Sequence, residues 1–193
     1  MFDMKINYEE LFSTKSNLLS IFRLFLAIPL WFLFDQLNTY WAPYVLFSIC
    51  ILVAVTDLLD GYLARKYKEV TEMGKIIDPL ADKVVVAAII LKLYLIGIIP
   101  HYYFFMIIGR DVIILVGGIY VTNKIGKVLP SNKLGKATVM NIGIVILLFI
   151  LNLSWDNIIF IIFYYLSIFL IFASLFGYIY RGLEYIKANN SKS

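Results

Sequence analysis

Residues 41–99 read WAPYVLFSICILVAVTDLLDGYLARKYKEVTEMGKIIDPLADKVVVAAIILKLYLIGII, and two apolar runs in this stretch flank a charged connection. The runs cover residues 41–59 and 77–99. Each is close to the length of about 20 mostly apolar residues that a helix needs to cross a bilayer. The short basic connection favours an antiparallel helix pair, so the charged residues around it are expected at one membrane surface.

The whole chain shares this apolar character. Of its 193 residues, 62% are hydrophobic and 16% are charged, whereas soluble domains have roughly 45–50% and 25%. This much apolar surface does not fit inside so small a globule, so lipid is expected to be the solvent for most of it. The net charge of +4 does not indicate a nucleic-acid partner, because Lys and Arg form short clusters between apolar runs.

Six runs are long and apolar enough to span a membrane. They cover residues 18–34, 41–59, 77–99, 102–121, 134–151 and 158–180. The connections on one side contain no Lys or Arg, and those on the other side carry clusters of both, which places the second side in the cytoplasm. The predicted fold is therefore an all-α integral membrane protein of the cell membrane, with six transmembrane helices and both termini in the cytoplasm.

Two end segments are expected to lie outside the bundle. Residues 1–16 show a weak amphipathic pattern, which fits a short N-terminal surface helix or an unstructured cytoplasmic tail equally well. This segment is too polar and acidic for a signal peptide. Residues 188–193 are expected to form a disordered tail. With no internal repeat, residues 1–193 are interpreted as a single membrane domain.

Four aspartates carry the chemical signal. Asp57 and Asp60 lie three residues apart at the end of the second run, and Asp78 and Asp82 lie four apart at the start of the third. Each pair shares a helix face. Carboxylates crowded at a membrane boundary repel one another and lose hydration, which a bound cation would relieve. With no Cys or His nearby, the oxygen donors favour Mg²⁺ or Mn²⁺.

The residues between these aspartates suit a phosphate ligand. Two ions sharing the carboxylates would hold a diphosphate. The small residues Gly61, Ala64 and Gly74 would let a ligand approach the backbone, and Arg65 can pair with a phosphate through two hydrogen bonds. The alternative, that the aspartates are ordinary charges at helix ends, explains a single aspartate better than four at these spacings.

The segment resembles the signature of the CDP-alcohol phosphotransferase family. It reads D-x-x-D-G-x-x-A-R, then eight residues, then G-x-x-x-D-x-x-x-D over residues 57–82, so every fixed position is filled. The similarity extends to the six-span layout, to NLLSIFR at residues 17–23 and to SNKLGK at residues 131–136.

The resemblance implies a reaction and a site. The phosphatidyl group of CDP-diacylglycerol would pass to a small polar alcohol, with release of CMP, at a cytoplasmic cavity of a homodimer embedded in membrane lipids. Asp57, Asp60 and Asp78 would bind two divalent cations, and Asp82 would complete the metal site and act as general base. The residues implied to bind the cytidine diphosphate part are Thr56, Asp60, Gly61, Ala64, Arg65 and Gly74.

The acceptor site is predicted in the second half of the chain. Arg110 lies well inside the fourth predicted span, where a charge indicates a functional site by default, although Asp111 beside it could simply neutralise it. Lys133 and Lys136 lie near Ser131 and suit a phosphate-bearing acceptor, although anchoring at the cytoplasmic surface explains them about as well. The resemblance favours acceptor binding in both cases.

Glycerol 3-phosphate is the first choice of acceptor, because it is common among bacterial members of the family and this loop is rich in lysine. The chain departs from the Arg-Glu pair and the Lys-Trp-Lys string of such synthases, with Arg110-Asp111 and Lys136-Ala137-Thr138. Phosphatidylglycerol, inositol phosphate and serine therefore stay open as acceptors. A divalent-cation transporter is the alternative class, but its carboxylates would be expected nearer the bilayer midplane.

Three further features have expected roles. Asn17 and Arg23 are expected to touch a phosphate near the entrance of the site. Lys92, in the outer half of the third span, is expected to snorkel towards the membrane surface. The Gly117-Gly118 pair would permit close helix packing or a tilted or kinked span.

Overall fold

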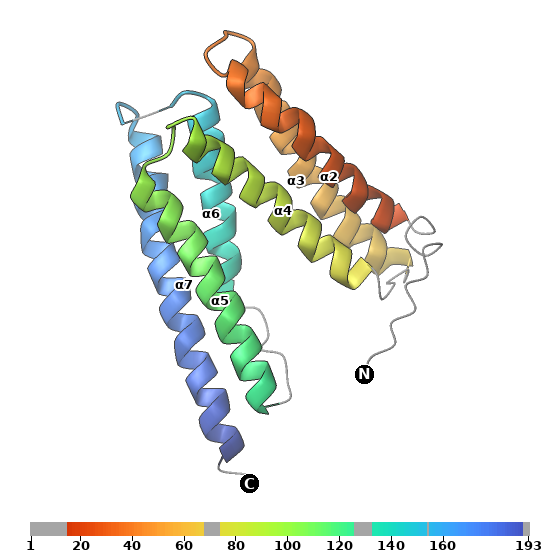
Figure 1. Cartoon of the computed structure of the whole chain (residues 1–193), viewed down its shortest axis with the longest axis vertical. Helices are drawn as coiled ribbons and strands as arrows, with labels where there is room; N and C mark the ends of the chain where they lie inside the picture. The colour runs from red at the N-terminus through yellow and green to blue at the C-terminus, as the bar shows by residue number, and fades with distance from the viewer. Residues whose placement is uncertain (1–14, 68–73, 126–132, 154, 191–193) are drawn as a thin grey trace. The chain divides into compact units, whose positions relative to one another are not determined.

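The computed structural model describes residues 15–67, 74–125, 133–153 and 155–190, and every regular element in these ranges is a helix. Figure 1 shows the long helices of these ranges, and the short 3-10 helix η1 lies between the first two of them along the chain. They are α2 (Lys15–Leu33), η1 (Phe34–Gln36), α3 (Ala42–Tyr67), α4 (Gly74–Leu95), α5 (His101–Ile125), α6 (Lys133–Ile150) and α7 (Ile158–Asn190).

The helical prediction is confirmed for the described residues, since each of the six predicted runs falls on one helix. Within the described part of the chain, three segments are long and apolar enough to cross a membrane: His101–Lys124, Lys133–Ile150 and Ile158–Lys187. A shorter apolar stretch, Ala42–Thr56, lies within α3. Residues 1–14, where most of the surface helix was predicted, and 191–193 lie outside the described residues, and α7 continues to Asn190.

The ends of the helices follow local backbone chemistry. Asn152, the second residue after the end of α6, adopts a left-handed conformation with φ of 57°. The N–H of Leu153 donates to the Leu148 carbonyl and that of Asn152 to the Phe149 carbonyl, which is the Schellman pattern that closes a helix. Asn157 then caps α7, because its Oδ1 accepts the backbone N–H of Ile159 at 2.9 Å.

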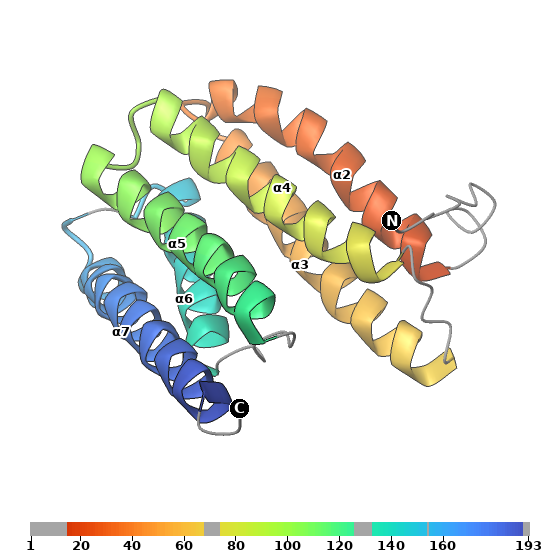
Figure 2. The ribbon, with the colours of Figure 1, turned by 60° about the horizontal axis from the view of Figure 1, so that its bottom comes forward.

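The chain divides into two compact units, residues 1–96 and 97–193. In the first unit α2 packs against both α3 and α4. Figures 1 and 2 show that α2 begins, α3 ends and α4 begins at the same end of this unit. Towards the other end, the core is built from apolar side chains that are almost fully buried: Leu30, Phe34, Leu46, Ile90 and Leu93.

Lys92 of α4 is buried among these residues, so the prediction that it snorkels outward is wrong. Its Nζ donates to both carboxylate oxygens of Asp35, at 2.7 and 2.9 Å, and lies 5.0 Å from the centre of the Trp31 ring. The lysine stays inside because η1 places a carboxylate within its reach. The pair ties α4 to the turn that follows α2.

In the second unit α7 packs against both α5 and α6. Tyrosine and serine hydroxyls between α5 and α7 are paired, as their apolar surroundings favour. The hydroxyls of Tyr103 and Ser167 lie 2.7 Å apart, and Tyr164 donates to Tyr102 at 2.8 Å. The α5–α7 contact also uses a glycine, since a Cβ on Gly118 would lie 2.7 Å from the hydroxyl oxygen of Tyr178. This supports the close-packing interpretation of that glycine pair.

Candidate active site

The acidic motif is divided between two helices of the first unit. Asp57 and Asp60 belong to the last part of α3, and Asp78 and Asp82 to the first part of α4. Residues three or four apart are separated by about 4.5 or 6 Å along a helix axis and share one face. Because α3 ends where α4 begins, both pairs lie at the same end of this unit (Figure 2).

These backbone positions test the helical part of the prediction but not the chemistry. The side chains of the four aspartates lie outside the described residues, so their metal-binding and catalytic roles stay predictions. Four carboxylates, with no cysteine or histidine in the motif, fit a hard divalent cation by charge and donor type. Among the side chains that the structure does describe, no group of three or more His, Cys, Asp or Glu could hold a metal.

The predicted nucleotide-binding residues follow the same helices. Gly61, Ala64 and Arg65 lie in the final turns of α3, and Gly74 is the first residue of α4. Their side-chain surroundings are outside the described residues. Thr56 is described and buried, and its hydroxyl donates to the Val53 carbonyl at 2.8 Å. Its oxygen keeps a lone pair with which it can accept a further hydrogen bond.

Arg110 is the centre of the polar contacts in the second unit. Its side chain is 8% exposed, and its Nη1 donates to Asp111 Oδ1 at 2.6 Å. Its Nε donates to the hydroxyl of Ser174 on α7 at 3.3 Å, and its Nη2 has a long contact of 3.5 Å with the Gly135 carbonyl on α6. The neutralising pair with Asp111 therefore forms, and the guanidinium also joins all three helices of this unit.

The two predicted acceptor lysines lie beside this arginine contact. Lys133 and Lys136 occupy the first turn of α6, where both are exposed. Gly135, between them, lies so close to the arginine that a Cβ there would be 3.3 Å from Arg110 Nη2. The structure thus brings the buried arginine to the end of α6 that carries the exposed lysines. Ser131, the fourth predicted acceptor residue, lies outside the described residues.

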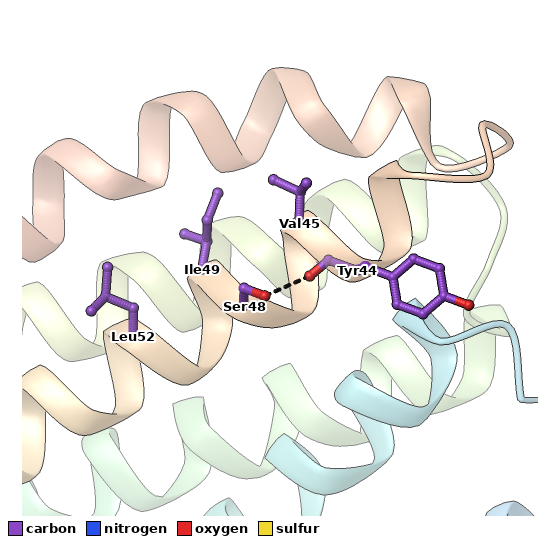
Figure 3. A pocket seen from close by; sticks show the side chains of 5 residues that line it. All are labelled: Tyr44, Val45, Ser48, Ile49 and Leu52. Carbon is purple, nitrogen blue, oxygen red and sulfur yellow. Dashed lines mark hydrogen bonds between the residues drawn. The ribbon is translucent and has the colours of Figure 1, made fainter.

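A groove elsewhere in the first unit has a different character. Figure 3 shows it along α3, lined by Tyr44, Val45, Ser48, Ile49 and Leu52. Ser48 donates its hydroxyl hydrogen to the Tyr44 carbonyl at 2.8 Å, so the groove offers a ligand little polarity. From Leu52 to Asp57 is about 7.5 Å of helix rise, and the groove extends away from the motif. It suits an apolar group rather than phosphate.

The helical architecture, the apolar helices of membrane-spanning length and the acidic motif define a class: helical membrane proteins with paired aspartates on two consecutive helices. Within that class, the family model of the CDP-alcohol phosphatidyltransferases matches residues 13–177. The chain belongs to this family, as its motif resemblance predicted. The match includes the acidic motif and reaches from the residues before α2 into α7.

Curated relatives share part of the chain. Over 71 residues the sequence is 46% identical to the CDP-diacylglycerol–glycerol-3-phosphate 3-phosphatidyltransferase of Pectobacterium atrosepticum, which covers 37% of this chain and 38% of that enzyme. It is 46% identical over 69 residues to the enzymes of the same name from Sodalis glossinidius and Yersinia enterocolitica, covering 36% of this chain and 37% of each relative. The chain therefore aligns with well under half the length of these relatives.

Proposed function

We propose that the protein transfers the phosphatidyl group of CDP-diacylglycerol to a small polar alcohol and releases CMP, in phospholipid biosynthesis. The observation that carries the proposal is the complete acidic motif on α3 and α4 within a family match that spans most of the chain. Glycerol 3-phosphate is the proposed acceptor, supported by the names of the relatives.

The four aspartates would have two roles, metal binding and proton abstraction. Asp57, Asp60, Asp78 and Asp82 would hold two divalent cations, Mg²⁺ or Mn²⁺, which when bound neutralise charge on the diphosphate and on the departing CMP. Asp82 would take the proton of the acceptor hydroxyl as that oxygen attacks the phosphorus bearing diacylglycerol. The new phosphorus–oxygen bond forms as the bond from that phosphorus to the CMP oxygen breaks, so CMP carries the electron pair away.

The nucleotide would be held by the remaining motif residues. Gly61, Ala64 and Gly74 would leave room for the cytidine diphosphate beside the helix backbones, and Arg65 would pair with a phosphate. Asp60 would contribute to this site as well as to the metals. Thr56 would accept a hydrogen bond, since its own hydrogen already reaches the Val53 carbonyl.

The acceptor would be bound by three cationic side chains and one hydroxyl of the second unit: Arg110, Lys133, Lys136 and Ser131. The burial of Arg110 and its contacts at the lysine-bearing end of α6 support this assignment. A dianionic phosphate gains more from these three cations than serine would. Phosphatidylglycerol and inositol phosphate would also present a phosphate, and they remain the alternative acceptors.

The membrane arrangement proposed for this activity has six spans, with both termini and the active site on the cytoplasmic side of the cell membrane. The six long helices and the clustering of Lys and Arg on one side of the predicted bundle support it. Residues 1–16 would lie along the cytoplasmic surface, and the active form would be a homodimer.

The test is CMP release by the purified full-length chain from CDP-diacylglycerol, with Mg²⁺ or Mn²⁺, against a panel of acceptors and with EDTA as the metal-free control. Metal-dependent release with glycerol 3-phosphate would establish the reaction and its acceptor. Absence of release with every acceptor, from folded protein with metal present, would overturn the proposal. A cation transporter would move metal without CMP, whereas the enzyme should run in reverse when CMP is added to its lipid product.

A further inference from the structure

Arg23 of α2 is the most deeply buried charged side chain among those described. It is 1% exposed and is the largest of the fully buried side chains. The helix around it is otherwise apolar and partly exposed, as at Phe22 and Phe25. A guanidinium in such surroundings requires compensation by negative charge or by several acceptors. A bound phosphate at the site entrance, the role expected for Arg23, does not suit a group that is closed off from solvent.

The two other buried cations among the described residues each form an ion pair with a carboxylate. Lys92 is paired with Asp35 in the first unit, and Arg110 is paired with Asp111 in the second. Each buried cation has a carboxylate within 3 Å, at 2.7 and 2.6 Å. The question for Arg23 is which carboxylates lie at its level on the helices that pack against α2.

The Lys92–Asp35 pair fixes the register of α2 against α4, and this register shows which residues of α4 lie level with Arg23. The helices α2 and α4 pack together and run in the same direction (Figures 1 and 2). Arg23 is 12 residues before Asp35, and the residue 12 before Lys92 is Leu80. Each interval is about 18 Å of helix. Arg23 therefore lies level with the segment of α4 that runs from Asp78 to Asp82.

We propose that Arg23 is a positioning residue for the acidic motif. Its buried guanidinium supplies a fixed positive charge level with the Asp78–Asp82 pair, which offsets the repulsion between the carboxylates while no metal is bound. The inference rests on the proposed metal-dependent function. It adds a residue from α2, outside the motif, that acts through the aspartates and does not touch substrate.

The charge balance has two measurable consequences. When Arg23 is replaced by Met, the carboxylates repel one another without their counter-charge, so the metal-free protein becomes less stable and Mn²⁺ binding recovers the lost stability. Removing a competing cation also strengthens Mn²⁺ binding. A unit charge within ~10 Å at an effective dielectric constant of about 20 changes affinity by roughly tenfold or more.

The experiment compares the full-length protein in detergent as wild type, Arg23→Met, Arg23→Gln, Arg23→Lys and Lys92→Met. Thermal unfolding is followed in EDTA and across a Mn²⁺ titration, and Mn²⁺ binding is measured by electron paramagnetic resonance. Lys92→Met is the matched control, because it removes a buried cation from the same unit at the end away from the motif. We expect Mn²⁺ to restore at least half of the loss in Tm for Arg23→Met and Arg23→Gln, and none for Lys92→Met.

The outcomes distinguish a residue that compensates the charge of the motif from one that only packs in the helix bundle. Arg23→Lys should keep the Mn²⁺ affinity within about twofold, whereas both neutral variants should bind Mn²⁺ about tenfold more tightly. A loss in Tm that Mn²⁺ leaves unchanged, with unaltered affinity, would overturn the proposal. So would neutral variants that fail to fold even in Mn²⁺, because the metal should replace the missing charge. If wild type and Asp78→Ala bind Mn²⁺ equally, the proposed metal-dependent function itself fails. If wild type binds Mn²⁺ more tightly than Asp78→Ala but the Arg23 variants change neither the Mn²⁺ affinity nor the recovery of Tm, only the positioning role fails.

Discussion

The Lys92–Asp35 pair allows a prediction in which the two partners have unequal effects. The lysine side chain is 9% exposed and the aspartate side chain is 52% exposed. Asp35→Asn leaves a buried ammonium group without its carboxylate. Breaking a fully buried pair costs about 3–5 kcal/mol, and the half-exposed partner lowers this to about 2–3 kcal/mol.

Lys92→Met has a smaller expected effect. The aspartate that it leaves behind can hydrate, and methionine fills most of the lysine's space. The free energy lost is then that of a partly exposed ion pair, up to about 1 kcal/mol, together with that of the cation–π contact with Trp31, about 0.5–1 kcal/mol. Lys92→Met should therefore lower the free energy of unfolding by about 1–1.5 kcal/mol. The double variant should have nearly the same free energy of unfolding as Lys92→Met.

The assay is a double-mutant cycle on the free energy of unfolding in detergent, measured by titration with a denaturing detergent. Because the double variant should be about as stable as Lys92→Met, the expected coupling energy equals the cost of Asp35→Asn, about 2–3 kcal/mol. The reasoning would be refuted if Lys92→Met destabilised the protein as much as Asp35→Asn, because packing of the lysine's methylene groups, and not its burial as a charge, would then dominate.

Three further predictions follow from the site and the packing. Asp78→Ala should abolish metal-dependent CMP release, measured against an EDTA control, while the fold survives by circular dichroism. Arg110→Lys should raise the KM for glycerol 3-phosphate at least tenfold with a smaller change in the KM for CDP-diacylglycerol, since a lysine does not reproduce three directed contacts. Gly118→Ala should be about 1 kcal/mol less stable than the control Gly109→Ala, because only the former Cβ meets Tyr178; equal thermal stabilities would contradict this.

The helices could be predicted from the sequence because apolar runs of membrane-spanning length have few alternatives. Their ends could not be predicted as well. The third run was expected to continue to residue 99, but α4 ends at Leu95, since Gly97 adopts a left-handed φ of 74°. Hydropathy does not detect such a turn, because Ile98 and Ile99 are as apolar as the helix. In the opposite sense, α3 continues past Leu59 to Tyr67, because charged residues can extend a helix beyond its apolar part.

The parts of the candidate site that depend on residues close together in the sequence could be predicted. The aspartate spacings place both pairs on helices, and the structure confirms those helices. The contacts between distant segments were not predictable. Lys92 and Asp35 are 57 residues apart, and no pattern in the sequence pairs them. Arg23 did carry a signal, since it lies inside the first predicted span, where a charge indicates a functional role by default.

The contacts of Arg110 bear on the choice of acceptor. Its guanidinium is buried, but the carboxylate paired with it is 53% exposed, so Asp111 can turn towards water at little cost when an anion competes for the same nitrogen. A phosphate-bearing acceptor would exchange one anionic partner for another and keep the buried charge compensated. Serine would bring a carboxylate together with an ammonium group, which the neighbouring Lys133 and Lys136 would repel. The charges of this unit therefore favour glycerol 3-phosphate over serine on physical grounds that are independent of the names of the relatives.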